Sequence, residues 1–427
     1  MLKEFSQGVN QNLSKRSSPQ VLTKKDLLSK LSILAISARY DNSCSSSGAR
    51  RESHPYGLGN THLSGICHTW SADGRCISLL KILMTNICIN DCKYCVNRIK
   101  NDVPRAILTP EEIAYLTVEF YRRNYIEGLF LSSGIIKDPD YTMELMLRAV
   151  KLLRKKYYFN GYIHLKLIPG ASRELVAEAF LLADRVSSNL EIAKEENLKR
   201  LAPQKSFSLL YTPLRIVREL YKEKNLKTPA STQLIVGATP ETDKDILSLA
   251  KELYQKKLVR RVYYSAYIPV NEDKDLPAIN EPPFLREHRL YQADWLLRFY
   301  GFSLEELFAE EEFLSLEMDP KLAWSLRNLH FFPIELTKAD YWELVRVPGI
   351  GPVSAKKIIR ARKEGPLTEE SLKKLGIPLK RAKYFITLRG KPLFKTTKFS
   401  EKIIKNQLVE TQLNLFKELS VYADCSL

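Results

Sequence analysis

Three cysteines within one short segment are the residues of this sequence best suited to metal chemistry. Cys88, Cys92 and Cys95 form a C-x3-C-x2-C array in the stretch CINDCKYC, directly after an apolar run. Cysteine thiolates hold iron–sulfur clusters, and three of them leave one iron of a four-iron cluster open to a chelating small molecule. A zinc knuckle or three unrelated thiols are the alternatives, although zinc normally takes four ligands and no His or Cys follows at short spacing.

This array resembles the motif of the radical S-adenosylmethionine superfamily, including an aromatic residue, Tyr94, just before the last cysteine. The resemblance covers residues 75–300. It implies a [4Fe-4S] cluster held by the three cysteines, with S-adenosyl-L-methionine bound to the open iron through its amino nitrogen and carboxylate. One-electron reduction of the sulfonium would then release a 5′-deoxyadenosyl radical.

Further segments match places where the superfamily binds S-adenosylmethionine. LSSG stands where the superfamily usually has a Gly-Gly-Glu turn that holds the methionine amino group, and SSNLE stands where polar side chains usually reach the ribose. The stretch QLIVGATPETD resembles the glycine-containing strand near the adenine. Ser and Asn at strand ends are also common turn signals, so a role in loop geometry is the alternative. The candidate cofactor-binding residues are Ser132, Ser133, Gly134, Ser188, Asn189 and Glu191.

The segments that must position these residues alternate between strand-like and helix-like patterns. Apolar runs predict six buried strands, in SLLKILMTNIC, GLFLSSGI, YIHLKLIP, RVSSNLE, TQLIVG and VYYSAYIPV, and stretches such as PEEIAYLTVEFYRRN and SRELVAEAFLLA predict helices between them. This alternation predicts an α/β fold, a partial (β/α)6 TIM-like barrel with its chemistry at the carboxyl ends of the strands. His164, Lys166 and Tyr264 are candidates for facing the chamber, with placement on the surface or in the core as the alternative.

The segment before the barrel combines a helix-like pattern with loops that contain three further cysteines. LTKKDLLSKLSILAISARY has helical apolar spacing, whereas SCSSSGARR and HPYGLGNTHLSGICHTWSADGRC are typical of loops. These cysteines could form a second metal site with neighbouring histidines or supply a hydrogen-donor thiol, but buried inert cysteines are the commoner outcome. The residues concerned are Cys44, Cys67, Cys76, His62 and His68, while Cys425 in the tail is interpreted as a bystander.

A basic segment near the C-terminus predicts contact with nucleic acid. Residues 337–399 hold 16 Lys/Arg against 5 Asp/Glu, which accounts for +11 of the net charge of +17. Within it, VRVPGIGPVSAKKIIR resembles the helix-hairpin-helix motif of DNA repair proteins, and LTEESLKKLGIPLKRAKYFITLRG resembles a weaker second copy. Such glycine hairpins let backbone N–H groups accept a phosphate. The alternative is a helical hairpin used only for packing. The candidate nucleic-acid-binding residues are Gly349, Gly351, Lys356, Lys357 and Arg360.

The tail contains a short segment, QLNLF, that resembles the peptide by which bacterial repair proteins bind the replication sliding clamp. Its residues are Gln412, Leu413, Asn414, Leu415 and Phe416. An amphipathic terminal helix that packs Leu408, Leu413 and Phe416 on the body explains the same residues.

The whole sequence indicates a soluble protein of several domains. No stretch approaches the roughly 20 apolar residues that a membrane-spanning helix needs, and the N-terminus lacks the apolar core of a secretory signal, so a cytoplasmic location without a membrane partner is expected. The predicted domains are an N-terminal helix with cysteine-containing loops at 1–75, the barrel at 76–300, a helical connector at 301–336, a small all-α helix-hairpin-helix module at 337–392 and a tail at 393–427.

Together, YDNSC, GICHTWSADGRCISLLKILMTN, the cysteine array and FYRRNYIEGLFLSSGII resemble a radical S-adenosylmethionine family named for DNA modification or repair. That resemblance implies hydrogen abstraction from DNA, with the hairpin module holding the duplex backbone and flavodoxin or ferredoxin as the electron donor. A target base within a duplex would have to be flipped, which costs a few kcal/mol. The alternatives are radical modification of tRNA or other RNA, and a non-catalytic iron–sulfur redox sensor that binds nucleic acid.

Overall fold

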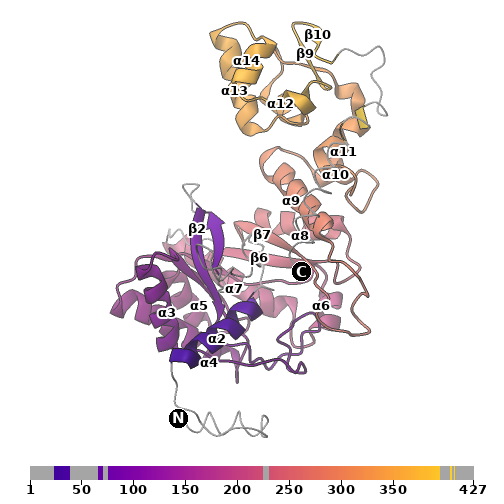
Figure 1. The fold of residues 1–427 in the computed structure, drawn as a ribbon. Helices are drawn as coiled ribbons and strands as arrows, with labels where there is room; N and C mark the ends of the chain where they lie inside the picture. Colours follow the sequence, from indigo (N-terminus) through magenta and orange to yellow (C-terminus); the bar gives the residue numbers. More distant parts are fainter. Residues whose placement is uncertain are drawn as a thin grey trace, which may run out of the picture.

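The protein folds into a large α/β body and a smaller, mainly helical body that are joined by a column of helices (Figure 1). The computed structural model describes residues 24–38, 66–70, 76–224 and 230–394, together with 404, 405 and 408. Among the described helices, none is long and apolar enough to cross a membrane.

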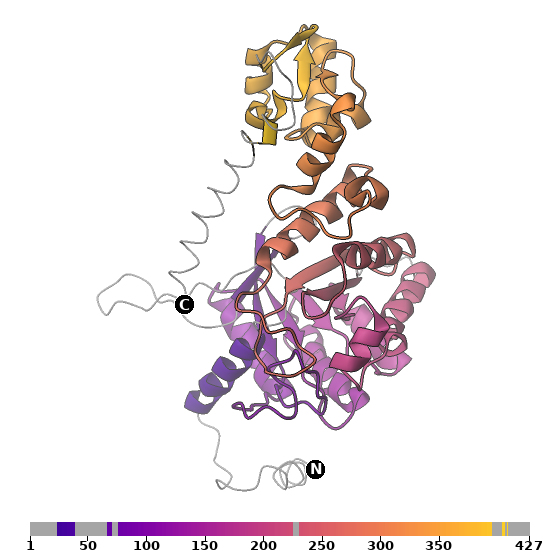
Figure 2. The same cartoon turned by 90° about the vertical axis from the view of Figure 1, so that its right-hand side faces the viewer.

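The large body is built on a sheet of seven strands in sequential order, β1 to β7. The first pair is antiparallel, whereas β2 to β7 are all parallel and curl into a half-barrel with helices on its outer side (Figure 2). This confirms the predicted partial TIM-like barrel. The strands are β1 Ile66–Trp70, β2 Cys76–Leu83, β3 Gly128–Ser132, β4 Tyr162–Lys166, β5 Arg185–Ser187, β6 Ala230–Val236 and β7 Arg261–Ala266.

The two faces of the sheet have different surroundings. On the outer face, Leu80, Leu129 and Ile163 belong to the large hydrophobic core that the sheet shares with the helices. On the inner face, Phe130 packs in a separate small cluster, and Tyr162 lies against that cluster. Because side chains alternate along a strand, the core-facing residues leave every second position for the chamber.

Helices cover the outer face and begin at well-defined caps. Thr109 and Glu112 form a capping box at the start of α3, and the Asp138 side chain caps α4. Helix α2 confirms the helix expected before the barrel. The helices of this body are α2 Lys24–Ser37, α3 Pro110–Arg122, α4 Pro139–Lys151, α5 Arg173–Leu182, α6 Glu195–Leu201, α7 Phe207–Lys224 and α8 Asp243–Gln255, with a π-helical turn at Leu152–Lys156.

Strand β1 departs from the expected loop before the barrel. It pairs antiparallel with β2, with Ile66 opposite Leu80 and Trp70 opposite Cys76. The segment ICHTW is rich in β-branched and aromatic residues, which favour strands, and the sequence SADG after it is typical of a tight turn. Glycine and serine on either side obscured this short strand in the sequence.

The column and the smaller body follow β7. The column contains α9 Phe284–Phe299, α10 Leu304–Phe308 and α11 Pro320–Arg327, followed by a 3-10 turn at Leu329–Phe331. The smaller body contains α12 Tyr341–Arg346, α13 Pro352–Glu364, α14 Glu369–Lys374 and α15 Leu379–Ala382. It is mostly helical as expected, but β8 Ile334–Glu335, β9 Ile386–Leu388 and β10 Lys391–Pro392 add a three-stranded sheet. Strands of two or three residues carry too little periodicity to be seen in a sequence.

Candidate functional site

The three cysteines of the array line one cavity of about 200 Å³ at the carboxyl ends of the parallel strands. Ser132 and Lys166 are the last residues of β3 and β4, and both line the same cavity. This is the end of a parallel α/β barrel where functional side chains gather. The cavity is also lined by Tyr94, Ser133, Gly134, Asn189, Glu191, Lys205, Gln233, Ser265 and Tyr267.

The cysteines lie on a long segment between β2 and α3, here called the cluster loop (residues 84–109), which folds around Arg105. The Arg105 guanidinium donates to the carbonyls of Asn86, Asn97, Arg98 and Asn101 at 2.5–2.9 Å. One side chain thus satisfies four backbone acceptors that no strand or helix pairs, and it fixes the path of the loop.

The thiols sit close to backbone amides, with Cys92 buried and Cys88 and Cys95 half-buried. The N–H of Ile135 donates to the Cys88 sulfur and the N–H of Asn97 to the Cys95 sulfur, each at 3.4 Å. Burial raises the pKa of the Cys92 thiol and raises the pKa of the Cys95 thiol to about 12. Because thiolates bind metal, cluster insertion would release these protons, and the two amides would then stabilise the sulfur charge.

The donor set fits a four-iron cluster better than a single ion. Within the described residues, no group of three or more His, Cys, Asp or Glu side chains is close enough together to hold one metal ion. Three thiols around one cavity, each serving a different iron, suit a cluster. Gly134 supports this fit, because a Cβ there would meet the Ile87 carbonyl oxygen at 2.4 Å and the Cys88 Cβ at 3.2 Å, so the end of β3 closes directly onto the cluster loop.

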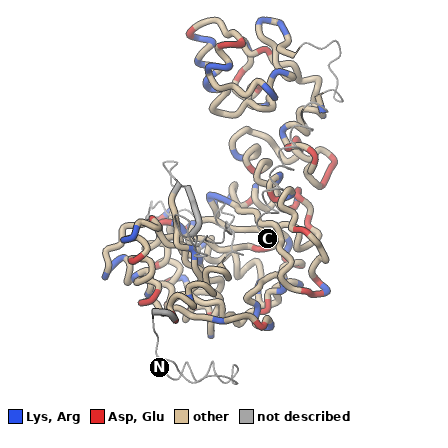
Figure 3. Tube along the Cα trace, viewed as in Figure 1, with Lys and Arg blue, Asp and Glu red and all other residues tan. Residues whose placement is uncertain are grey.

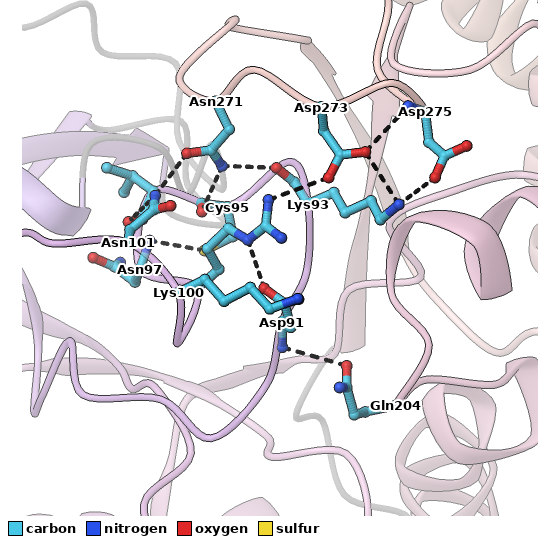
Figure 4. A network of polar contacts seen from close by, with 12 residues as sticks. Asp91, Lys93, Cys95, Asn97, Lys100, Asn101, Gln204, Asn271, Asp273 and Asp275 are labelled. Atoms are coloured by element: carbon cyan, nitrogen blue, oxygen red, sulfur yellow. Dashed lines mark hydrogen bonds and ion pairs between the residues drawn. The ribbon is translucent and has the colours of Figure 1, made fainter. Parts of the chain in front are cut away.

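A polar network ties the cluster loop to the segment after β7 (Figure 4). The Asn271 side-chain amide donates to the Lys93 and Cys95 carbonyls at 2.7 and 2.9 Å. The Lys93 ammonium contacts Asp273 at 3.1 Å and also pairs with Asp275. The two segments are some 180 residues apart in the chain, so only the closed half-barrel brings them together.

Lys205 places a buried positive charge in the cavity wall. Its ammonium lies 3.1 Å from a Glu191 carboxylate oxygen and 3.2 Å from the Tyr94 hydroxyl. Neighbouring acidic groups outweigh its burial, so the pKa of Lys205 lies well above its usual value. Glu191 has a positive φ of 66°, a strained backbone that is held by its two hydrogen bonds with β6, at Gln233 and Ile235.

Five of the six residues predicted to bind S-adenosylmethionine line the cavity. Among them, the Asn189 amide contacts Gln233 at 3.3 Å, and the Ser133 hydroxyl donates to the Gly134 carbonyl at 2.7 Å. Ser188 is the exception, because it is buried and its hydroxyl lies 3.3 Å from the Leu210 carbonyl on α7. Its side chain points to the helical side of the sheet, as the alternation along a strand requires.

The three residues considered as candidates for facing the chamber also lie on different faces of the sheet. Lys166 lines the cavity, and His164 lies on the same face of β4, where its Nε2 is 2.9 Å from the Ser187 hydroxyl. Tyr264 lies on the opposite face of β7, where its hydroxyl donates to Asp294 on α9 at 3.1 Å. Tyr264 is therefore a packing residue.

A larger groove of about 740 Å³ lies outside the half-barrel, between α7 and α8. Its walls include Arg215, Glu219 and Glu252 but no thiol. Size alone would favour this groove as the functional site. The strand ends and the three cysteines converge on the smaller cavity, however, and therefore favour that cavity.

The predicted nucleic-acid residues lie together at the turn between α12 and α13. Gly349 has φ of 90°, and Gly351 precedes the first turn of α13. Lys356, Lys357 and Arg360 are exposed on α13, and the Lys357 ammonium donates to the Leu375 carbonyl at 2.9 Å.

Several sequence predictions fall on residues that the structure does not describe. The clamp-binding residues Gln412, Leu413, Leu415 and Phe416 lie outside the described residues, as do Cys44, His62 and Cys425. Cys67, His68 and Cys76 lie on β1 and β2, but only their backbone is described.

Comparison with known proteins identifies the barrel. Residues 82–253 match the family model described as "Radical SAM superfamily". No curated protein matches the chain.

Solved structures with a similar fold include the FeFe-hydrogenase maturase HydG from Carboxydothermus hydrogenoformans (15% identity, TM-score 0.39, 50% of each chain covered). Methylornithine synthase (PylB) matches with 15% identity and TM-score 0.37 over 69% of this chain and 84% of that one. Coproporphyrinogen III oxidase (HemN) from Escherichia coli matches with 18% identity and TM-score 0.33 over 49% and 50%. The chain spans about half the length of the two HydG structures, and similarity this low carries no argument about activity.

The matched segment contains most of the residues that line the cavity, including the three cysteines, Ser132 and Lys166. Residues 82–253 are therefore a radical S-adenosylmethionine superfamily domain, an enzyme domain whose cofactors are a [4Fe-4S] cluster and S-adenosyl-L-methionine.

Proposed function

We propose that this protein is a radical S-adenosylmethionine enzyme that modifies or repairs DNA. The observation that carries the proposal is the pair of sites on one chain: a thiol-lined barrel cavity, and a glycine turn that opens a helix bearing three exposed cations. When bound to the cluster, S-adenosylmethionine supplies a 5′-deoxyadenosyl radical that abstracts hydrogen.

In this proposal, the residues of the barrel bind the two cofactors, orient them and shield them from water. Cys88, Cys92 and Cys95 hold the cluster. Lys205 balances negative charge at the cavity wall, and burial of the cavity keeps bulk water away from reactive species. Asn189 and Glu191 take the ribose, and the turn at residues 132–134 takes the methionine end.

The smaller body supplies the DNA contact. Helices α12 and α13 flank one glycine turn, and α14 and α15 flank a second turn at Gly376, which also has positive φ. We interpret this arrangement as a paired helix-hairpin-helix. The unpaired N–H groups at the start of α13 and the cations beyond them suit phosphate oxygens, which gives affinity with little sequence preference. Lys and Arg recur along the traces of α13 to α15 (Figure 3).

The proposal predicts that the triple variant K356A/K357A/R360A loses most of its affinity for duplex DNA. Each lost phosphate contact removes about 0.9 from the slope of log affinity against log salt, so the slope should fall by up to about three and Kd should rise at least about tenfold. Fluorescence anisotropy with a labelled 20-base-pair duplex across a salt series measures both. K155A/K156A/R200A, which removes three exposed cations from the large body, serves as the matched control.

The enzymatic part is tested by anaerobic reconstitution of the full chain with dithionite and DNA. Formation of 5′-deoxyadenosine together with a mass change in the DNA is expected, and C92A should abolish both. Product formation without any change in the DNA, or tighter binding of tRNA than of duplex DNA, would overturn the DNA assignment. Absence of 5′-deoxyadenosine would favour a redox sensor.

A further inference from the structure

The groove of about 740 Å³ outside the half-barrel, here called the outer groove, has no role in the function proposed above. Helix α7 packs against α5, and α8 packs against α9. The sides of α7 and α8 that line the outer groove are left open to a ligand. The volume of the groove lies in the range of sites that bind small molecules.

Helix α7 turns one face toward the outer groove. The residues of this face recur at spacings of three or four, which places them on the same side of a helix. They are Phe207, Tyr211, Arg215, Arg218 and Lys222. The first two are aromatic and the last three are cationic, so the face has an apolar part followed by a positive part.

The carboxylates of the outer groove already have basic partners. The groove is lined by five Lys/Arg and three Asp/Glu. Each of the three carboxylates lies 2.5–2.7 Å from a basic nitrogen, in the pairs Glu219 with Arg173, Asp245 with Lys194 and Glu252 with Lys256. Within the part of the chain that the structure describes, no carboxylate pairs with the three cations of α7. These cations therefore remain available to an anion.

Arg218 stands out among the three cations. The residue is half-buried, and its Nε is buried without a hydrogen-bond partner. Leaving a buried donor unpaired is costly, and the long side chain can turn this N–H toward an acceptor in the groove. A phosphate has three or more acceptor oxygens and suits the fork of an arginine.

The aromatic part of the face suits the apolar part of the same ligand. Phe207 is half-buried, and its ring centre lies 5.7 Å from that of Tyr211. The Arg215 guanidinium lies 5.9 Å from the centre of the Tyr211 ring. Leu249 and Leu258 add apolar surface to the groove. Nucleobases stack on aromatic rings and on guanidinium planes, so a base and a phosphate on one ligand match the two parts of the face.

The outer groove is separate from the cofactor cavity. Glu191 lines the cavity, whereas Ala193, two residues later, lines the groove. In the same way, Lys205 lines the cavity and Phe207 lines the groove. These two segments lie between the hollows, so a ligand in the groove is bound outside the chamber in which the radical forms.

We propose that the outer groove binds a nucleoside phosphate, with Arg215, Arg218 and Lys222 on the phosphate and Phe207 on the base. The site is distinct from the cofactor cavity and from the glycine turn of the smaller body. The inference therefore goes beyond the proposed function and does not depend on it. The nucleoside phosphate can be a free nucleotide or one unit of a nucleic-acid strand.

The test uses thymidine 5′-monophosphate as the probe, because its base differs from the adenine of the cofactor. Isothermal titration of the full-length, cluster-reconstituted protein should show binding that saturating S-adenosylmethionine does not displace. Thymidine, which lacks the phosphate, and 2-deoxyribose 5-phosphate, which lacks the base, should each bind at least about tenfold more weakly. F207A should weaken the probe but leave the binding of the sugar phosphate unchanged.

Variants of the cations locate the site. R218Q and R215Q/K222Q should each weaken the probe at least about tenfold. K155Q/K156Q removes two exposed cations of the same body outside the groove, and it should bind the probe as wild type does. Thermal melting checks the folding of each variant. R215Q/K222Q changes only exposed residues and keeps the test decisive if R218Q does not fold.

Three results would overturn the proposal. The first is equal binding of thymidine and its monophosphate, which would show that the cations do not bind phosphate. The second is equal binding of the probe to wild type and to R215Q/K222Q. The third is displacement of the probe by S-adenosylmethionine, which would place the probe in the cofactor cavity.

A single-stranded thymidine decamer separates the two sources of the nucleoside phosphate. It is titrated into K356A/K357A/R360A, so that the three cations of α13 do not contribute. Tighter binding of the decamer than of the probe indicates a strand, and weaker binding indicates a free nucleotide. In both cases, adding R215Q/K222Q should reduce the binding, and an unchanged affinity would contradict the proposal. Loss of duplex binding with intact probe binding would reject DNA as the substrate and keep the outer groove as a nucleotide site.

Discussion

At the scale of single residues, the site depends on contacts that the cysteine spacing does not reveal. Cys88, Cys92 and Cys95 could be proposed as cluster ligands from the sequence because their spacing is local and chemically distinctive. Asn271 and Lys205 carry no such mark, because each reaches the cluster loop from a distant part of the chain. In a sequence, an Asn in a loop is most simply interpreted as a turn residue. Only the folded structure shows that Asn271 donates to two carbonyls of the cluster loop.

Asn271 provides a prediction at this scale. N271A leaves the Lys93 and Cys95 carbonyls without their partner, at a cost of about 1–3 kcal/mol. We expect a looser cluster loop, seen as faster removal of iron by a chelator from the reconstituted protein. Q204A, which removes a 3.3 Å contact to the exposed Asp91 amide, is the matched control and should release iron at the wild-type rate. Equal rates for N271A and wild type would show that the network does not hold the loop.

At the scale of elements, the sequence was informative wherever a segment was long and periodic. All six predicted barrel strands form, and each of them ends before the segment from which it was predicted. Apolar residues such as Met84 and Ile87 continue past the end of β2, so hydrophobicity alone does not mark the strand end. Of the three residues considered as candidates for facing the chamber, His164 and Lys166 of β4 do face it. Tyr264 of β7 packs on α9 instead.

The turn between α12 and α13 depends on a buried lysine of α11. The Lys321 ammonium donates to the Ile350 carbonyl at 2.5 Å and lies 4.9 Å from the centre of the Tyr300 ring. Burial lowers the pKa of Lys321 to about 7, with Asp319 opposing this shift and Arg381 and Arg346 adding to it.

This lysine predicts a dependence of stability on pH. The unfolded chain has a lysine pKa of about 10.4, so between pH 7 and 10 it binds more protons than the folded chain at this group. The free energy of unfolding should therefore rise with pH in this window, by up to about 1.4 kcal/mol per unit. Urea titrations at pH 7, 8 and 9 should show a smaller rise in K321M than in wild type. K338M, at an exposed position, should follow wild type, and a K321M profile parallel to wild type would contradict the prediction.

At the scale of the whole molecule, one arginine joins the smaller body to the column. The Arg346 guanidinium lies 3.9 Å from the centre of the Phe302 ring and 5.2 Å from that of Trp324. It also pairs with Glu306 at 2.9 Å and donates to the Gly301 carbonyl at 3.0 Å. These contacts hold α12 against the helices that lead back to the barrel.

R346A should therefore loosen the placement of the smaller body relative to the barrel. The lost cation–π contacts and hydrogen bonds amount to about 2 kcal/mol or more. Small-angle X-ray scattering should show a larger radius of gyration for R346A, and calorimetry should show the two bodies unfolding in separate steps. K363A, an exposed change on α13, should leave both measurements as in wild type. An unchanged scattering curve for R346A would place the rigidity of the column elsewhere.

The six parallel strands contain no Asp or Glu, so the sheet itself supplies no carboxylate to the site. Among the described residues that line the cavity, the acidic one is Glu191, which follows the end of β5. Loops vary more readily than the strands that they connect. The charge of the cavity wall can therefore change with a connecting segment while the sheet stays the same.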